Sequence, residues 1–208
     1  MTPWRILIVV VATALIASCG ATGTKPSPTP ATAHNRDDRL VLSLDGLGPL
    51  KFDMPDEQVA ATGLVRRVAC GEPFGPEAWR WEPTRAYRKK GGMGSHTFEV
   101  SSYDGKLRSF DVWASSIPTD HGVRVGDTVA ELKAAYGSGL SEHPLGYPNA
   151  NGRVYTVEGK RSALVFDVVA GDAETFGPVG TIWVMRLEER SSRYDTLANT
   201  DGGAGGCL

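Results

Sequence analysis

A short pattern that begins with glycine occurs twice in this 208-residue chain and limits how it can fold. The first copy starts at Gly46 with Gly-Leu-Gly-Pro-Leu-Lys-Phe, and the second starts at Gly122 with Gly-Val-Arg-Val-Gly-Asp. A helix start follows each copy: Pro55 precedes two acidic residues, and Thr128 begins a capping-box sequence, Thr-Val-Ala-Glu. We therefore interpret the chain as a duplication of one small unit that begins with a short helix.

Alternating hydrophobic and polar residues after each expected helix predict antiparallel strands. In the first copy, residues 97–101 alternate, Asp104-Gly105 is typical of a hairpin turn, and residues 106–115 form the returning strand. In the second copy, the expected strands are residues 153–157, 162–169 and 180–188. The predicted fold class is α+β: two tandem units, residues 39–118 and 119–190, each with a short helix packed on an antiparallel meander. Such a sheet can leave its outer face open to a partner.

These patterns carry a family resemblance. The sequences Gly-x-Gly-Pro-Leu-x-Phe-x-Met and Gly-Val-x-Val-Gly-Asp-Thr-x-x-Glu-Leu-x-x-x-Tyr-Gly resemble the repeated modules of secreted actinobacterial proteins. They are also similar to the β-lactamase inhibitor protein fold and to the SmpA/OmlA domain of small lipoproteins. The resemblance covers residues 42–187, and it implies short helices on a small antiparallel sheet and a role in binding other proteins.

The N-terminus has the organisation of a signal peptide. Arg5 precedes an apolar run, residues 6–16, that is too short to span a bilayer, and the sequence Ile-Ala-Ser-Cys-Gly then places Cys19 after small residues. This resembles the lipobox of bacterial lipoproteins, which implies removal of residues 1–18 and attachment of diacylglycerol to the Cys19 thiol. The alternatives are an ordinary secretory signal with an incidental cysteine, or a buried N-terminal helix.

Two further segments lack the pattern of a folded domain. Residues 19–38 are rich in proline and threonine, which predicts an extended tether, and residues 191–208 form a flexible glycine-rich tail. With the lipidated cysteine, the tether predicts a protein held at the cell membrane on its extracytoplasmic face, with the lipid as its link to the membrane. In that oxidising location Cys70 and Cys207 can form one disulfide. The alternative is a buried free thiol at Cys70 and an exposed one at Cys207.

No pattern of catalytic, metal-binding or cofactor-binding residues stands out. The four histidines form no metal-binding pair, the glycine-rich turns lack the lysine of a phosphate-binding loop, and no serine or cysteine lies in an activating motif. The net charge of −2 gives no electrostatic reason to expect nucleic-acid binding. We therefore expect no enzyme activity, no metal and no cofactor.

Trp79 and Trp81 are the candidate binding residues, because two indoles two positions apart share one side of an extended segment. The alternative is that both pack in the core. The sequence thus predicts a lipid-anchored extracytoplasmic binding or envelope-associated protein without catalytic activity, with an envelope protein as its possible partner. A cell-envelope enzyme acting on peptidoglycan or lipid, and a small-ligand carrier, are the alternatives.

Overall fold

The computed structural model describes residues 40–73, 77–84, 87, 96–144, 152–168 and 178–190. All of them belong to the second of the chain's two compact units, Ala33–Leu208. The described strands are β1 (Leu42–Ser43), β2 (Gly46–Leu47), β3 (Leu50–Lys51), β4 (Val65–Ala69), β5 (Trp79–Pro83), β6 (Phe98–Tyr103), β7 (Lys106–Val112), β8 (Leu140–Pro144), β9 (Arg153–Glu158), β10 (Ser162–Val168) and β11 (Ile182–Glu189). The helices are α1 (Asp56–Ala61), α2 (Val129–Tyr136) and the 3₁₀ turn η3 (Gly137–Gly139).

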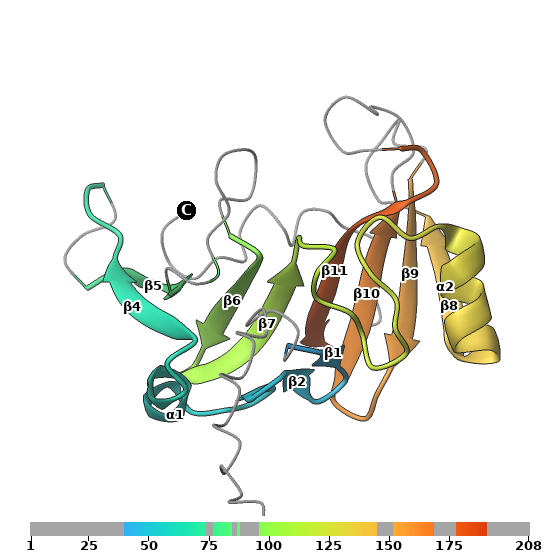
Figure 1. Cartoon of the computed structure of the whole chain (residues 1–208). Coiled ribbons are helices and arrows are strands. Elements are labelled where there is room, and N and C mark those ends of the chain that lie inside the picture. Colours follow the sequence, from blue (N-terminus) through green and yellow to red (C-terminus); the bar gives the residue numbers. More distant parts are fainter. Residues whose placement is uncertain are drawn as a thin grey trace, which may run out of the picture. The chain divides into compact units, whose positions relative to one another are not determined.

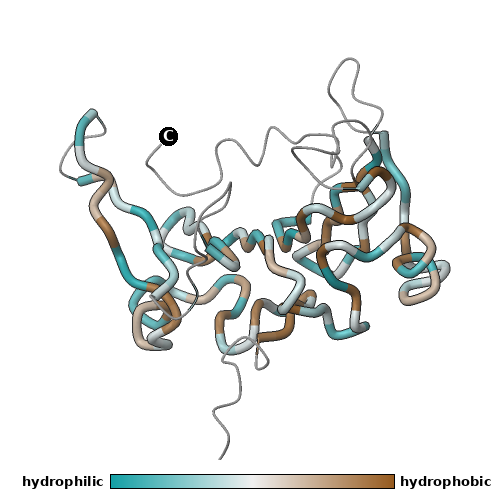
Figure 2. The backbone as a smooth tube through the Cα atoms, turned by 45° about the horizontal axis from the view of Figure 1, so that its top comes forward, coloured by the Kyte–Doolittle hydropathy of each residue, from teal (hydrophilic) through white to brown (hydrophobic). Residues whose placement is uncertain are grey.

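The strands form three antiparallel sheets. The largest has six strands in the order β6-β7-β11-β10-β9-β8, and the other two are β1-β2-β3 and the hairpin β4-β5. Figure 1 shows the six-stranded sheet, with β1 and β2 in front of it and α2 beside β8. Along the tube of Figure 2, hydrophobic segments (brown) alternate with hydrophilic ones (teal).

The expected α+β fold of two separate helix-on-sheet units is wrong, because the structure is mostly β-sheet. Strands from both expected units share one sheet: β7 pairs with β11, with Phe110 opposite Leu187 and Val112 opposite Met185. The two helices have only six and eight residues, and each has one fully buried residue, Val59 in α1 and Leu132 in α2. Helices this short cannot cover a meander each, and pairing between strands of the two expected units contributes to burying the meanders instead.

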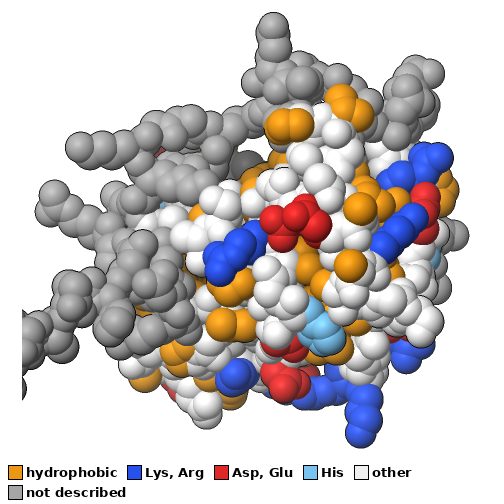
Figure 3. Space-filling view, turned by 45° about the vertical axis from the view of Figure 1, so that its right-hand side comes forward, with side chains coloured by type: hydrophobic (Ala, Val, Ile, Leu, Met, Phe, Trp, Pro, Cys, Tyr) orange, Lys and Arg blue, Asp and Glu red, His pale blue; other side chains and the backbone are white. Residues whose placement is uncertain are grey.

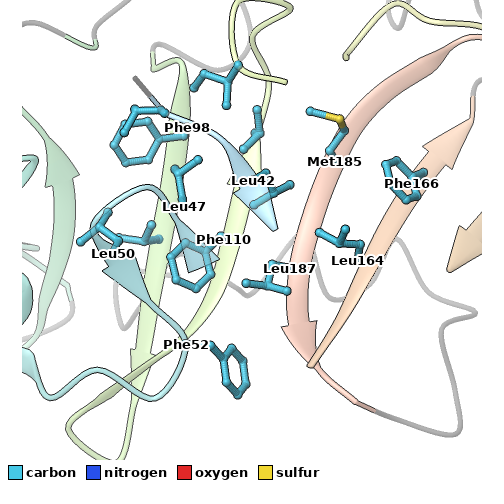
Figure 4. Packing of buried hydrophobic residues seen from close by; sticks show 14 of the residues in the cluster. Leu42, Leu47, Leu50, Phe52, Phe98, Phe110, Leu164, Phe166, Met185 and Leu187 are labelled. Atoms are coloured by element: carbon cyan, nitrogen blue, oxygen red, sulfur yellow. The ribbon is translucent and has the colours of Figure 1, made fainter. Parts of the chain in front are cut away.

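The first face of the large sheet carries the main hydrophobic core. Phe98, Phe110, Leu164 and Leu187 each have at most 1% of their surface exposed. Figure 4 shows such residues packed beneath the N-terminal segments, which contribute Leu42, Leu47 and Leu50. The small sheet β1-β2-β3 thus takes the place over the core that the helices were expected to occupy.

The local turn and cap predictions are confirmed. Asp104 and Gly105 have φ angles of 52° and 70° in the β6–β7 hairpin, as the expected Asp-Gly turn requires. Thr128 caps α2 in a complete capping box with Glu131. In the small sheet, Gly46 has a φ of 143°, and a Cβ there would lie 2.0 Å from the carbonyl oxygen of Leu50, so only glycine fits.

Candidate functional site

The predicted disulfide residues are only partly described. Cys19 and Cys207 lie outside the described residues. Cys70, which follows β4, is disulfide-bonded, so the alternative of a free thiol at this position is wrong. Its pairing with Cys207, and the lipidation of Cys19, stay predictions.

Trp79 and Trp81 lie on β5, with their ring centroids 5.1 Å apart in an edge-to-face arrangement. Trp81 is only 4% exposed, and its Nε1 donates a hydrogen bond of 2.7 Å to the hydroxyl of Ser102 on β6. Trp79 is half-buried, and the Arg67 guanidinium lies 3.7 Å from its ring centroid. Trp81 therefore belongs to the core, as one alternative expected, and a binding role for the pair stays a prediction.

The second face of the large sheet contains a buried cluster of charged residues that the sequence reasoning missed. Arg186 on β11 is 2% exposed and donates two hydrogen bonds of 3.0 Å, one to each carboxylate oxygen of Asp167 on β10. A third hydrogen bond, of 2.8 Å, goes to Glu188. On the other side of Arg186, its direct register partner on β7 is Asp111, whose own partner on β6 is Glu99.

This cluster holds more carboxylates than cationic groups, and the pKa values of its buried carboxylates are raised. Burial raises the pKa of Asp111 to about 7, and Glu99, Glu188 and Asp167 add to the rise, while Arg186 opposes it. Burial likewise raises the pKa of Asp167 and of Glu188, again against the attraction of Arg186. A protonated Asp111 removes one negative charge from the cluster, so the arrangement is electrostatically most favourable below neutral pH.

Much of the second face is buried, so it lacks the solvent-open surface that the expected meander could have left for a partner. Thr156, Val165 and Asp167 are each 0% exposed, and Val154 and Ala163 are as fully buried. Polar residues on this face therefore pair with one another instead of facing solvent. One sequence signal was available: Arg186 follows Ile-Trp-Val-Met in a strand whose other residues are mainly hydrophobic.

A cleft of about 670 Å³ opens at one end of the large sheet. Its walls come from three segments: the β1–β2 turn with Leu44 and Asp45, the end of β3 with Lys51 and the following Phe52, and the β9–β10 turn, residues 159–161, together with Ser162 at the start of β10. Figure 1 shows these segments meeting along the lower edge of the sheet. Phe52 donates its N–H to the carbonyl of Asp45 at 2.9 Å, which fixes two of the walls to each other.

The described part of the chain offers two negative findings. None of its clusters of histidine, cysteine and carboxylate side chains has the arrangement needed to hold a metal ion. None of the helices within it is both long and apolar enough to cross a membrane. Figure 3 shows acidic and basic side chains interspersed among hydrophobic ones on the face that it presents, without one large field of a single sign.

Comparisons with known proteins give little beyond the geometry. No family model matches the chain, and a search of curated proteins finds no match. Among solved structures, the chain is similar to the uncharacterized protein yfeY from Escherichia coli, at 17% sequence identity and a TM-score of 0.41. The alignment covers 72% of this chain and 99% of that chain. A likeness this distant supports no conclusion about function.

Proposed function

We propose that this chain is a lipid-anchored, extracytoplasmic binding protein without catalytic activity. The observation that carries the proposal is the sequence Ile-Ala-Ser-Cys at residues 16–19, after a short apolar run. The disulfide at Cys70 supports the extracytoplasmic location, because disulfides persist in oxidising compartments and are rare in the cytosol. A lipid anchor raises the local concentration of the domain near envelope partners without any new contact.

The geometry favours binding over catalysis. Asp167 is one of the carboxylates with a raised pKa. It and its partner Arg186 are almost fully shielded from solvent, so a substrate has no path to that carboxylate. The open cleft, by contrast, is lined by lysine, arginine and apolar side chains, which are suited to holding a ligand. A ligand-binding role therefore fits the accessible site, and the buried cluster fits a structural role.

The anchor is tested by changing Cys19→Ala in the full chain and labelling cells with a palmitate analogue. We expect the label to disappear and the signal peptide to remain, because the acyl acceptor is gone. Cys207→Ala is the matched control and should keep the label. Equal labelling of the wild type and the Cys19→Ala variant would overturn the proposed function.

A further inference from the structure

Hydrogen bonds and ion pairs hold the walls of the cleft together. The hydroxyl of Ser162 donates a 2.5 Å hydrogen bond to the carbonyl of Leu44, which joins the β9–β10 turn to the β1–β2 turn. Arg161 and Arg108 both pair with the Asp53 carboxylate, which ties the same turn to the segment after β3 and to β7. The walls are therefore fixed by hydrogen bonds and ion pairs between segments far apart in the sequence.

The charges around the cleft favour an anion. Lys51, Lys160 and Arg161 line it, against a single acidic lining residue, Asp45. Arg161 is engaged by Asp53, but within the described ranges neither lysine has an ion-pair partner. Both lysines are exposed, so their ammonium groups are free to approach a ligand in the opening. Two exposed ammonium groups beside a guanidinium that Asp53 holds form a suitable environment for a phosphate group.

The cleft also has an apolar side. Phe52, whose ring lies 5.8 Å from the Arg108 guanidinium, and the half-buried Leu44 are part of its lining. Gly159 lines the cleft as well, and a Cβ there would lie 3.3 Å from a Leu44 methyl carbon and 3.0 Å from the carbonyl oxygen of Ser162. The β9–β10 turn thus packs closely against Leu44. A ligand that fits both kinds of surface has an anionic head and an apolar part.

The cleft lies close to the point where the predicted tether joins the domain. Leu44 lies four positions after Leu40, where the described chain begins, and an extended segment of that length spans at most about 14 Å. We infer that the cleft binds the phosphate-bearing headgroup of an anionic phospholipid. This inference rests on the proposed lipid anchor, which places the domain beside a membrane, and it names that membrane's anionic lipid as the ligand.

The test is native mass spectrometry of the full-length lipidated protein, released from nonionic detergent with phosphatidylglycerol or phosphatidylcholine present. We expect one retained phosphatidylglycerol per chain and at least tenfold less phosphatidylcholine. Lys160→Glu should lower phosphatidylglycerol retention about tenfold, because it replaces an attractive charge with a repulsive one. Arg80→Glu, an equal charge change at an exposed residue of β5, should leave retention unchanged. Thermal melts of the two variants should match the wild type.

Three outcomes would overturn the inference. Equal retention of both lipids would mean that the charges do not select the headgroup, and retention unaffected by Lys160→Glu would place the lipid elsewhere. Displacement of phosphatidylglycerol by an equal concentration of inorganic phosphate would identify a free phosphate as the ligand. Because the readout counts bound lipid and not membrane attachment, its failure is distinguishable from loss of the anchor, which the Cys19→Ala labelling reports.

Discussion

Asp111→Asn should change how the stability of this protein depends on pH. Asp111 is 7% exposed and is faced by Glu99 from β6, by Arg186 and Glu188 from β11, and by Asp167 from β10. Burial raises its pKa from 3.8 to about 7 in the folded protein, whereas the unfolded chain releases the proton near the ordinary value. Between these two values the folded state binds more protons, so the free energy of unfolding falls as pH rises from about 4 to about 7.

A pKa difference of about three units corresponds to about 4 kcal/mol of stability, fully present below the unfolded pKa and lost above pH 7. Asparagine has nearly the same shape and cannot ionise, so the variant lacks this loss. Urea unfolding of both proteins at pH 4.5 and pH 8 measures the effect. The difference in free energy of unfolding, Asp111→Asn minus wild type, should be at least about 2 kcal/mol more favourable to the variant at pH 8 than at pH 4.5.

Two features of the comparison isolate Asp111. Asp167 and Glu188 also have raised pKa values, and their contributions are present in both proteins, so most of their effect cancels in the difference. Asp104→Asn, at the exposed β6–β7 turn, controls for the general effect of removing a carboxylate. The same stability difference between variant and wild type at both pH values would refute the electrostatic reasoning.

Two further predictions concern stability alone. Trp81→Ala should lower the free energy of unfolding by about 3–5 kcal/mol, since it empties a buried site and leaves Ser102 without its indole donor, whereas Trp79→Ala should cost clearly less; equal thermal melts for the two variants would contradict this. Thr128→Ala should cost about 1 kcal/mol by removing the cap of α2, and Thr128→Ser should restore most of it; a melt for Thr128→Ala that matches the wild type would show that the capping box contributes nothing.

The parts of the fold that depend on neighbouring residues could be predicted from the sequence. The helix start at Thr128 and the turn at Asp104-Gly105 follow from side-chain chemistry within a few residues, and both are present. The pairing of β7 with β11 could not be predicted, because alternation shows that a segment is a strand and not which strand lies beside it. The pairing of β4 with β5 could not be predicted for a different reason. Prolines at positions 76 and 83 stand on either side of the two β5 tryptophans and argue against a central strand, and β5 belongs to a separate two-stranded sheet.

The candidate sites show a similar division. The polar side of a strand usually faces water, so the sequence pattern alone favours solvent-exposed positions for Asp111 and Asp167. Both are in fact buried, and their burial depends on Arg186 from another strand. The cleft combines Lys51 with Lys160, which lie far apart in the sequence, and neither stands in a motif that indicates a binding site. In both cases the chemistry arises from strand order and from the docking of turns.

The pairing of β7 with β11 has a consequence for the order in which the protein folds. The β6–β7 hairpin and the β9–β10–β11 meander each involve contacts between neighbouring segments, whereas Asp111 and Arg186 are about 75 residues apart along the chain. Closing a loop of that length is entropically expensive and slow, so the two local pieces should form first and join last. Until they join, each has an unpaired strand edge that invites association with another chain. The seam between β7 and β11 is therefore where a nascent molecule would be most prone to aggregate.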